Sequence, residues 1–391
     1  MIPTQNQLLF PLLETIRDMG GKAPTKELCR KLAERMEISS EERTETIDVK
    51  SRKGVNVWER QVRWTQQLAK LRALACREGD TWKLTEKGQG KLQNAQPGVV
   101  VTLFENDSGV VLWSEAEAAV HTIEDDSISA IITSPPYPLL HKKDYANQLP
   151  EREHVEWLAS IFEAAKPKLR QDGSLVLNLG PVWQPGRPTM SLYGERLLIK
   201  LCDDLGYHLA SKLYWHNPSK MPSPAEWVTV RRIRVTPAVE EIYWLSRSEF
   251  PKANNRNVLR PYSERMKQLL AAKGDKAQQR PSGHTLRRGA FQKDCGGSIP
   301  HNLITAPNTS SNDAYQRFCR TRGLPIHPAR FPVALPDFFI RLLTDPGDII
   351  WDMFGGSLGA AEAAQKLGRK FIINEKARVY CHGGIGGRLM A

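Results

Sequence analysis

Residues 1–92 carry the apolar spacing of short amphipathic helices. Apolar side chains recur every three or four positions in residues 8–16, 25–36 and 58–74, and a glycine pair follows the first of these segments, which predicts three helices. Residues 75–85 alternate apolar and polar positions on both sides of a Glu-Gly-Asp turn, the pattern of a β-hairpin. Three helices followed by a hairpin predict a small, mainly α-helical winged-helix domain.

After a bridge at residues 93–108, the pattern becomes that of an α/β domain over residues 109–391. Continuous apolar runs such as residues 129–133 and 173–179 predict buried parallel strands, and helical segments such as residues 154–169 lie between them. Strands that alternate with helices predict a parallel sheet covered by helices on both faces.

Basic charge is concentrated in one part of this second region. The whole chain of 391 residues has a net charge of +12, and residues 209–330 carry 21 Lys+Arg against 8 Asp+Glu. This concentration predicts a polyanionic partner, although a single basic cluster is more typical of a solvated surface. We therefore expect residues at about 217–322 to contact a polyanion such as double-stranded DNA. The arginines expected at the DNA are Arg231, Arg232, Arg234, Arg287 and Arg288.

The strand predicted at residues 129–133 runs directly into Ser134, Pro135, Pro136 and Tyr137. Prolines fix φ and remove N–H donors, so we expect a rigid loop at the carboxyl end of a parallel strand, where open α/β sheets bind ligands. The Ser134 hydroxyl and a proline carbonyl can accept both hydrogens of an aromatic amino group and free its lone pair, while Tyr137 stacks on a flipped-out base. A turn with a packed tyrosine is the alternative interpretation.

A second motif occupies residues 348–376 and reads as a strand, a glycine turn, a helix and a second strand. Gly355 and Gly356 let a cofactor approach the backbone and open a helix N-terminus toward it. Glu375 follows Gly355 by 20 residues, the spacing at which an acidic side chain on the next strand binds ribose hydroxyls. A βαβ turn without a ligand is the alternative.

Together, TSPPY at residues 133–137 and the later FGGS at residues 354–357 resemble the β-class amino-methyltransferases of DNA. In that family the catalytic loop comes first, target recognition lies between, and the cofactor loop comes last. The resemblance therefore implies a target-recognition region at about residues 217–322, which contacts double-stranded DNA. The resemblance covers about residues 109–380 and implies a class I S-adenosylmethionine-dependent methyltransferase fold, a Rossmann-like, largely parallel sheet with one reversed strand near the edge. Three further segments resemble the same family: residues 173–180, 214–248 and 327–332.

The resemblance also implies roles for individual residues. The residues that would hold the target base and activate its amino group are Ser134, Pro135, Pro136 and Tyr137. Those that would bind S-adenosylmethionine are Thr133, Asp352, Phe354, Gly355, Gly356, Ser357 and Glu375, with His327, Pro328 and Phe331 closing the pocket. The chain departs from the family pattern at Met353, where proline is usual, and at Leu358, where glycine is usual.

Residues 1–92 resemble the N-terminal domain of the Mrr family of restriction proteins. The resemblance rests on LLFPLLETI, KELCRKLAERMEISSEER, VWERQVRWTQQLAKLRAL and GDTWKLTEKG. Residues 1–95 hold 18 Lys+Arg against 13 Asp+Glu, an excess that fits contact with DNA. A winged helix that docks a protein is the alternative.

The two resemblances imply a site-specific DNA methyltransferase of a restriction-modification or related prokaryotic or phage system. Its cofactor would be S-adenosylmethionine, and its partners would be double-stranded DNA and a cognate restriction endonuclease. Serine at the start of the first motif is more typical of N4-cytosine enzymes, so cytosine N4 is the predicted target and adenine N6 the alternative. Carbon-5 methylation is disfavoured, since no cysteine lies near the loop. A DNA-binding regulator without enzymatic activity is an alternative of another class.

The remaining features narrow the class of protein. None of the six cysteines forms a CxxC pair, so we expect no metal site and reduced thiols in the cytoplasm, with the protein at the nucleoid. The chain shows neither a signal-peptide pattern nor an apolar run of about 20 residues, so no membrane association is expected. Both a monomer and a homodimer fit the sequence.

Overall fold

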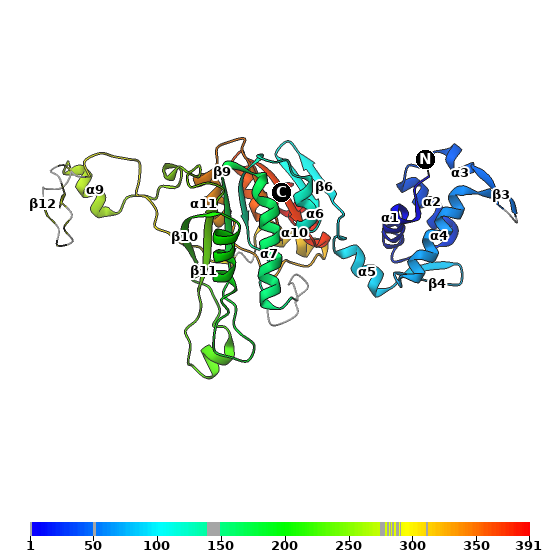
Figure 1. Cartoon of the computed structure of the whole chain (residues 1–391), viewed down its shortest axis with the longest axis horizontal. Helices are drawn as coiled ribbons and strands as arrows, with labels where there is room; N and C mark the ends of the chain where they lie inside the picture. Colours follow the sequence, from blue (N-terminus) through cyan, green and yellow to red (C-terminus); the bar gives the residue numbers. More distant parts are fainter. Residues whose placement is uncertain are drawn as a thin grey trace. The chain divides into compact units, whose positions relative to one another are not determined.

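The computed structural model describes residues 2–49, 52–138, 149–273, 278–279, 281, 283, 285–286, 289, 291–309 and 312–391. The chain divides into two compact units, Met1–Gln96 and Pro97–Ala391 (Figure 1). The boundary falls within the bridge expected at residues 93–108. The later part of that bridge is not a linker, however, because strand β6 (Val101–Asn106) belongs to the sheet of the second unit. The mostly apolar residues 99–104 were the signal for this edge strand that the sequence interpretation missed.

In the first unit, helices and a small antiparallel sheet enclose a core that includes Leu8, Leu12, Trp58 and Trp82. The described residues form a sheet with strand order β1-β5-β4, and β4 and β5 are the hairpin expected from the sequence. A second hairpin, β2–β3, precedes α4 and has no counterpart in the sequence-based expectation. The elements are α1 (Gln5–Asp18), β1 (Lys22–Pro24), α2 (Thr25–Arg35), α3 (Ser40–Thr44), β2 (Thr46–Val49), β3 (Arg52–Asn56), α4 (Val57–Leu71), β4 (Ala75–Glu78), β5 (Thr81–Leu84) and α5 (Glu86–Gln93).

The second unit is built on a sheet whose described strands have the order β14-β10-β11-β9-β8-β15-β16-β7-β6. Strands β9, β8, β15, β16 and β7 are parallel neighbours, while β11 runs antiparallel to β9 and β10, and β6 runs antiparallel to β7. The sheet therefore has the reversed strand expected near one edge and another at the opposite edge. The strands are β7 (Gly109–Trp113), β8 (Ile128–Thr133), β9 (Leu169–Leu179), β10 (His208–His216), β11 (Val239–Ser246), β14 (Leu303–Thr305), β15 (Ile349–Asp352) and β16 (Lys370–Glu375).

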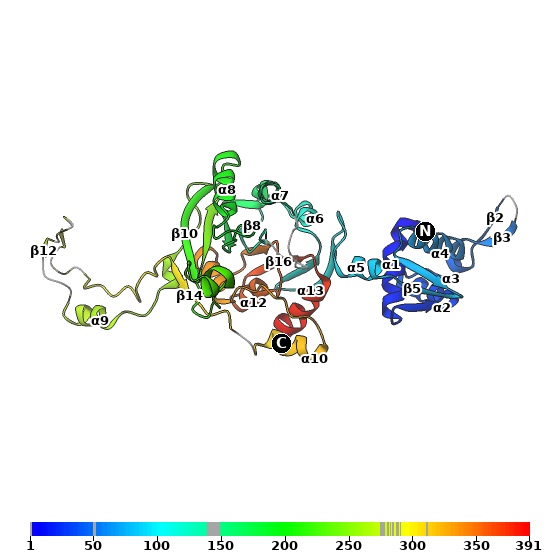
Figure 2. The ribbon, with the colours of Figure 1, turned by 90° about the horizontal axis from the view of Figure 1, so that it is seen from below.

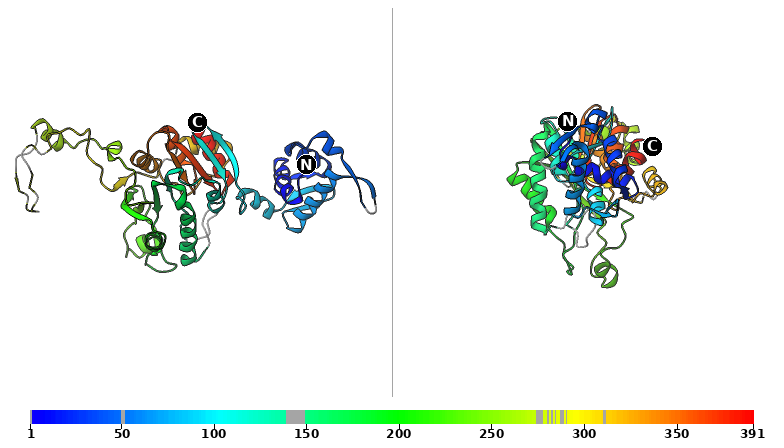
Figure 3. Two further views of the ribbon diagram at one scale, coloured as in Figure 1. Left: turned by 45° about the horizontal axis from the view of Figure 1, so that its top comes forward. Right: turned by 90° about the vertical axis from the view of Figure 1, so that its right-hand side faces the viewer.

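Helices cover both faces of this sheet. Figure 2 shows α6, α7 and α8 on one side and α10, α12 and α13 on the other, and Figure 3 shows the early strands β6 and β7 beside the late strand β16. Apolar residues of α7, including Leu158 and Phe162, pack on Ile131, Leu175 and Trp351 of the sheet. The helices are α6 (Ala116–Ala119), α7 (Glu151–Ala165), α8 (Tyr193–Ile199), α9 (Glu264–Ala271), α10 (Ala314–Arg322), α11 (Ala334–Leu343), α12 (Gly359–Lys366) and α13 (Arg378–Gly384).

The target-recognition region expected at residues 217–322 is not one continuous insertion. Strand β11 divides it, because its buried apolar residues complete the sheet between β9 and β10. Residues 217–238 leave the sheet after β10 and return at β11 (Figure 1), and the second piece begins at residue 247. Among the described helices, none is both long and apolar enough to cross a membrane.

Candidate active site

The two sequence motifs meet at neighbouring strand ends. Strands β8 and β15 pair in parallel, with Ile131 opposite Trp351, so Thr133 and Asp352 finish at the same edge of the sheet. The Thr133 hydroxyl donates a 2.6 Å hydrogen bond to Asp352 Oδ1, and both side chains are buried. Parallel pairing thus joins segments that lie more than 200 residues apart.

The glycine turn after β15 is closed by Glu375 from the end of β16. The Gly356 N–H donates to Glu375 Oε2 at 2.8 Å, and the Ala377 N–H donates to Oε1 at 2.7 Å. Gly355 lies so close to β16 that a Cβ there would come within 2.2 Å of Ile373 Cγ2. The turn therefore requires glycine at this point, and the carboxylate holds its backbone in place.

Two carboxyl groups at this turn are withdrawn from water. Burial raises the pKa of Glu375 to about 7 and the pKa of Asp352 to about 6, although hydrogen bonds lower both in part. Asp352 Oδ2 has no hydrogen-bond partner among the described residues. A buried carboxylate oxygen that can still accept a hydrogen bond, beside a glycine turn, suits a polar ligand that carries hydroxyl or amino donors.

His327 lies beside the same turn. Its Cε1 would be 3.3 Å from a Cβ placed on Gly356, and its ring meets the Tyr380 ring edge-on with centroids 4.4 Å apart. The His327 N–H donates to Tyr315 Oη at 2.9 Å, which fixes the segment. Burial lowers the pKa of His327 to about 4, so the ring is neutral near pH 7. The adjacent Pro328 is exposed.

The other residues of the turn are held by packing and by an arginine. The Phe354 ring meets Trp157 of α7 edge-on, with centroids 6.0 Å apart. Arg388 Nε donates to the Ser357 carbonyl at 2.7 Å, and Nη2 lies 3.4 Å from the Ser357 hydroxyl. These contacts anchor the turn from the side of the C-terminal helix.

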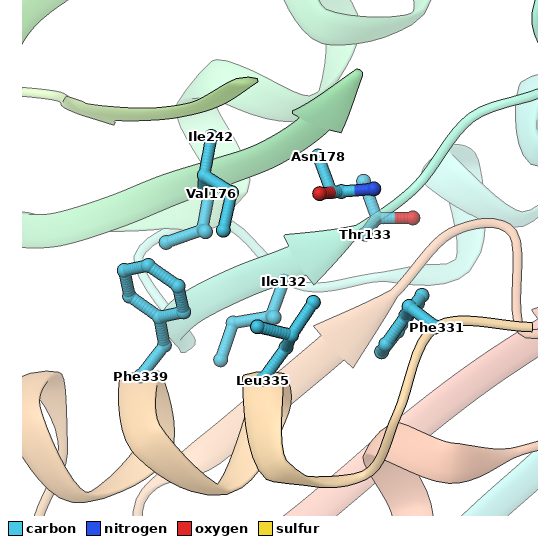
Figure 4. A pocket seen from close by; sticks show the side chains of 8 residues that line it. All are labelled: Ile132, Thr133, Val176, Asn178, Ile242, Phe331, Leu335 and Phe339. Atoms are coloured by element: carbon cyan, nitrogen blue, oxygen red, sulfur yellow. The ribbon is translucent and has the colours of Figure 1, made fainter. Parts of the chain in front are cut away.

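Phe331 lines a small apolar pocket between the sheet and α11 (Figure 4). Its walls come from β8, β9, β11 and α11, and two polar side chains stand at its edge. The pocket reaches the first motif at Thr133, and none of its lining residues belongs to the second motif. The lining residues are Ile132, Thr133, Val176, Asn178, Ile242, Phe331, Leu335 and Phe339.

The loop after β8 belongs to a hydrogen-bond network that spans three strands. Ser134 Oγ lies 3.1 Å from Tyr137 Oη and 3.2 Å from the Asn178 carbonyl. Tyr137 Oη donates to Glu240 Oε2 at 3.2 Å, and Asn178 Nδ2 donates to the same oxygen at 2.9 Å. Asn178 Nδ2 also lies 3.2 Å from Tyr137 Oη. The network therefore holds the Ser134 and Tyr137 hydroxyls within hydrogen-bond distance of each other.

Tyr137 is fixed by its neighbours as well as by its hydroxyl. A Cβ on Gly180 would come within 2.4 Å of Tyr137 Cε2, and the Tyr193 ring is tilted against it at 6.4 Å. Burial, followed by the nearby Glu240, raises the pKa of Tyr137 well above its usual value, so the hydroxyl keeps its proton. Pro135 is buried and Pro136 half-buried. The loop is therefore rigid.

Three polar residues of this network were missed in the sequence interpretation. Asn178 and Glu240 complete the network, and Lys220 Nζ lies 3.7 Å from Glu240 Oε1. Asn178 is the next-to-last residue of the run GSLVLNL, and Glu240 stands near the start of the strand VEEIYWLS. A polar side chain at the end of a buried strand was the available signal.

The arginines expected at the DNA lie apart from this network in the chain. Arg231, Arg232 and Arg234 are exposed on residues 217–238. Arg231 Nε donates to Glu226 Oε1 at 2.7 Å. The other two expected arginines are outside the described residues: Arg287 and Arg288.

Comparisons with known proteins identify the family of this chain. A family model described as DNA methylase matches residues 128–385, and the model of the Mrr N-terminal domain matches residues 6–94. The chain is 42% identical over 279 residues to the Type II methyltransferase M.PvuII of Proteus hauseri, which covers 71% of this chain and 82% of the relative. It is also 22% identical over 258 residues to the Type II methyltransferase M.BglII of Bacillus subtilis, which covers 66% of this chain and 62% of that relative.

One solved structure, titled PvuII DNA methyltransferase (cytosine-N4-specific), superposes with a TM-score of 0.59 at 34% identity. The match covers 75% of this chain and 88% of that one. The predicted class I methyltransferase fold and both sequence resemblances are therefore confirmed. The chain belongs to the N6/N4 DNA methylase family.

Proposed function

We propose that the protein transfers a methyl group from S-adenosylmethionine to the N4 amino group of cytosine in double-stranded DNA. The observation that carries the proposal is the fixed Ser134–Tyr137 pair at the end of β8, beside the cofactor-type turn of β15. The choice of cytosine is supported by the likeness to M.PvuII, whose solved relative is titled cytosine-N4-specific.

The turn after β15 has the features that S-adenosylmethionine requires. Glu375 would accept the ribose hydroxyls, since its oxygens stand at the tip of β16 beside the glycine backbone. Asp352, with a buried oxygen left over among the described residues, would accept a further donor of the cofactor. Phe354, Ser357 and His327 would line the pocket. When bound, the cofactor supplies an electrophilic methyl group.

The loop after β8 would prepare the base. An aromatic amino group is a weak nucleophile because its lone pair is delocalised into the ring. Ser134 Oγ and the Pro135 carbonyl would accept its two hydrogens and turn the lone pair toward the methyl group, while Tyr137 would stack on the base. The rigidity of this loop means that little reorganisation is needed on reaction.

Basic residues outside the pocket would hold the DNA. The excess positive charge of residues 209–330 fits phosphate contacts, and the exposed Arg231, Arg232 and Arg234 lie within it. We place the protein in the cytoplasm at the nucleoid, with a cognate restriction endonuclease as a further partner. A measurement of the protein's mass in solution distinguishes a monomer from a homodimer.

The test is methyl transfer from labelled S-adenosylmethionine to mixed-sequence duplex DNA, with the modified nucleosides identified by mass. N4-methylcytosine is the expected product. N6-methyladenine would overturn the target base and keep the class of reaction. A protein that does not bind S-adenosylmethionine would favour the regulator without enzymatic activity.

The first unit would add a second DNA contact, which deletion of Met1–Gln96 tests. We expect the remaining unit to bind S-adenosylmethionine with unchanged affinity and to bind DNA more weakly, with a shallower salt dependence, because basic residues are lost. Unchanged DNA affinity and unchanged site choice would rule out a DNA-binding role for this unit.

A further inference from the structure

Glu240 is a carboxylate on the base side of the site that lies outside both sequence motifs. It stands on β11, the reversed strand next to β9, and the register of Ile242 opposite Asn178 brings it to the end of β9 that faces the loop of Ser134. Its side chain is only 12% exposed. A carboxylate enclosed to this degree needs partners that offset its loss of hydration.

Its two oxygens face different surroundings. Oε2 accepts hydrogen bonds from Tyr137 Oη at 3.2 Å and Asn178 Nδ2 at 2.9 Å, inside the site. Oε1 faces Lys220 Nζ at 3.7 Å, and that lysine is 31% exposed. The carboxylate thus connects the interior of the site with a side chain at the surface.

A continuous hydrogen-bonded chain leads from Ser134 to this carboxylate. The Ser134 hydroxyl can donate either to the Asn178 carbonyl at 3.2 Å or to Tyr137 Oη at 3.1 Å. The chain forms in the second orientation, in which Tyr137 Oη donates to Glu240 Oε2 at 3.2 Å. Asn178 Nδ2 lies 3.5 Å from Ser134 Oγ, which leaves one lone pair of the serine for an incoming N–H group. Every donor between the serine and the carboxylate then has an acceptor.

The proposed reaction creates a proton that must leave. The amino nitrogen forms a bond to the methyl carbon, and the carbon–sulfur bond breaks with its electron pair left on sulfur. The nitrogen then carries four bonds and a positive charge. Loss of one N–H proton is needed to give the neutral methylated base.

We propose that Glu240 is the final acceptor of this proton, which reaches it through Ser134 and Tyr137. The inference rests on the proposed function. The amino group gives its proton to Ser134 Oγ, the serine proton passes to Tyr137 Oη, and the tyrosine proton passes to Glu240 Oε2. The transfers are concerted, since a buried tyrosinate beside a carboxylate is unfavourable. Glu240 ends protonated and neutral.

Glu240 acts through Tyr137 and is therefore a positioning and proton-accepting residue, not one that touches the base. A purely structural alternative exists, in which the carboxylate only anchors Lys220 and orients Asn178. The two roles predict different effects of removing the negative charge of Glu240 on the rate of methyl transfer. A glutamine at this position keeps the size of the side chain and one hydrogen-bond acceptor, but it cannot take up the proton.

The experiment compares Glu240→Gln and Glu240→Asp with wild type in single-turnover methyl transfer to cytosine. We expect Glu240→Gln to slow the transfer step about 10²-fold, the usual contribution of a positioned proton acceptor, while Kd values for S-adenosylmethionine and DNA stay within about twofold. Glu240→Asp, which restores a carboxylate, should recover at least half of that loss on a logarithmic scale. The matched control is Glu241→Gln on the same strand, whose carboxylate bonds to Tyr243 instead.

A double-mutant cycle tests the path through Tyr137. If the proton passes along Ser134, Tyr137 and Glu240, then adding Glu240→Gln to Tyr137→Phe should cause no further loss of rate. Thermal melting of each variant separates misfolding from a slower reaction step. Wild-type rates in Glu240→Gln, equal rates in Glu240→Asp and Glu240→Gln, or additive losses in the cycle would each overturn the inference. Wild type that methylates only adenine would instead overturn the proposed function, as the product nucleoside would reveal.

Discussion

The two halves of the site are held together in different ways. On the cofactor side, Glu375 accepts backbone N–H groups from Gly356 and Ala377, and every residue involved lies within one strand–turn–helix–strand segment. On the base side, Ser134 and Glu240 belong to strands far apart in the chain, and side chains make most of the bonds between them.

This difference concerns more than geometry. On the cofactor side, burial raises the pKa values of two carboxyl groups, so a fraction of each stays protonated near neutral pH in the absence of a ligand. On the base side, two hydrogen-bond donors and a lysine already surround Glu240. We therefore expect the half assigned to the cofactor to release protons when it binds a ligand, whereas the half assigned to the base is organised in advance.

The largest expected effect comes from Ser134→Ala on the base side. Losing one fixed hydrogen-bond partner of the reacting group should lower kcat about 10²- to 10³-fold, with the Kd for S-adenosylmethionine unchanged. Rapid-quench assays and calorimetry check this, with Ser160→Ala on α7 as the control, because that hydroxyl bonds only locally, to the Trp157 carbonyl. A tenfold change in cofactor affinity would mean that the two halves are not separable.

Glu375→Gln should instead weaken cofactor binding and leave kcat almost unchanged. Loss of a charged hydrogen-bond acceptor costs about 1.5–3 kcal/mol, so we expect the Kd for S-adenosylmethionine to rise about 10- to 100-fold. At saturating cofactor, kcat should stay close to wild type. The control is Glu163→Gln, an exposed carboxylate on α7. A collapse of kcat with normal cofactor affinity would contradict the assignment of Glu375 to the cofactor half.

Cofactor affinity should depend on pH, because the Glu375 pKa is raised to about 7. An ionised carboxylate binds ribose hydroxyls better, so affinity should be full above pH 7 and fall by up to about tenfold per unit below it. The stability of the free protein should change with pH in the opposite direction. Between the ordinary carboxyl range and pH 7, the folded state holds more protons than the unfolded state. The free energy of unfolding therefore falls as the pH rises through that window. Calorimetry and thermal melts measure both, and Glu375→Gln should flatten the binding profile.

The smallest expected effect concerns the bond that joins the halves. Thr133→Val keeps the shape of the side chain and removes the 2.6 Å hydrogen bond to Asp352. We expect cofactor affinity and kcat each to fall about two- to threefold, which together correspond to one buried hydrogen bond of about 1 kcal/mol. An effect confined to one of the two quantities would show that Thr133 belongs to that half alone.

Much of the fold followed from local patterns. The strands β8, β9, β15 and β16 lie within one or a few residues of their expected positions, because buried parallel strands are continuous apolar runs. The helix expected at residues 154–169 begins earlier, at Glu151, and ends at Ala165, since Pro167 follows and helices tend to end before proline. The hairpin β2–β3 was missed because it has no marked apolar run. The edge strand β6 was missed although residues 99–104 are mostly apolar, because that run lies in a segment interpreted as a bridge between domains.

The sequence by itself determined the glycine turn and the Ser134–Tyr137 loop, because each is a short segment in which glycines permit a tight turn or prolines fix the backbone locally. It also determined the class of protein, through the order of the two motifs. The tertiary structure alone decided that Thr133 meets Asp352 and that Glu240 reaches Tyr137. These contacts depend on strand order and register, which bring together residues distant in the chain and which no local spacing encodes.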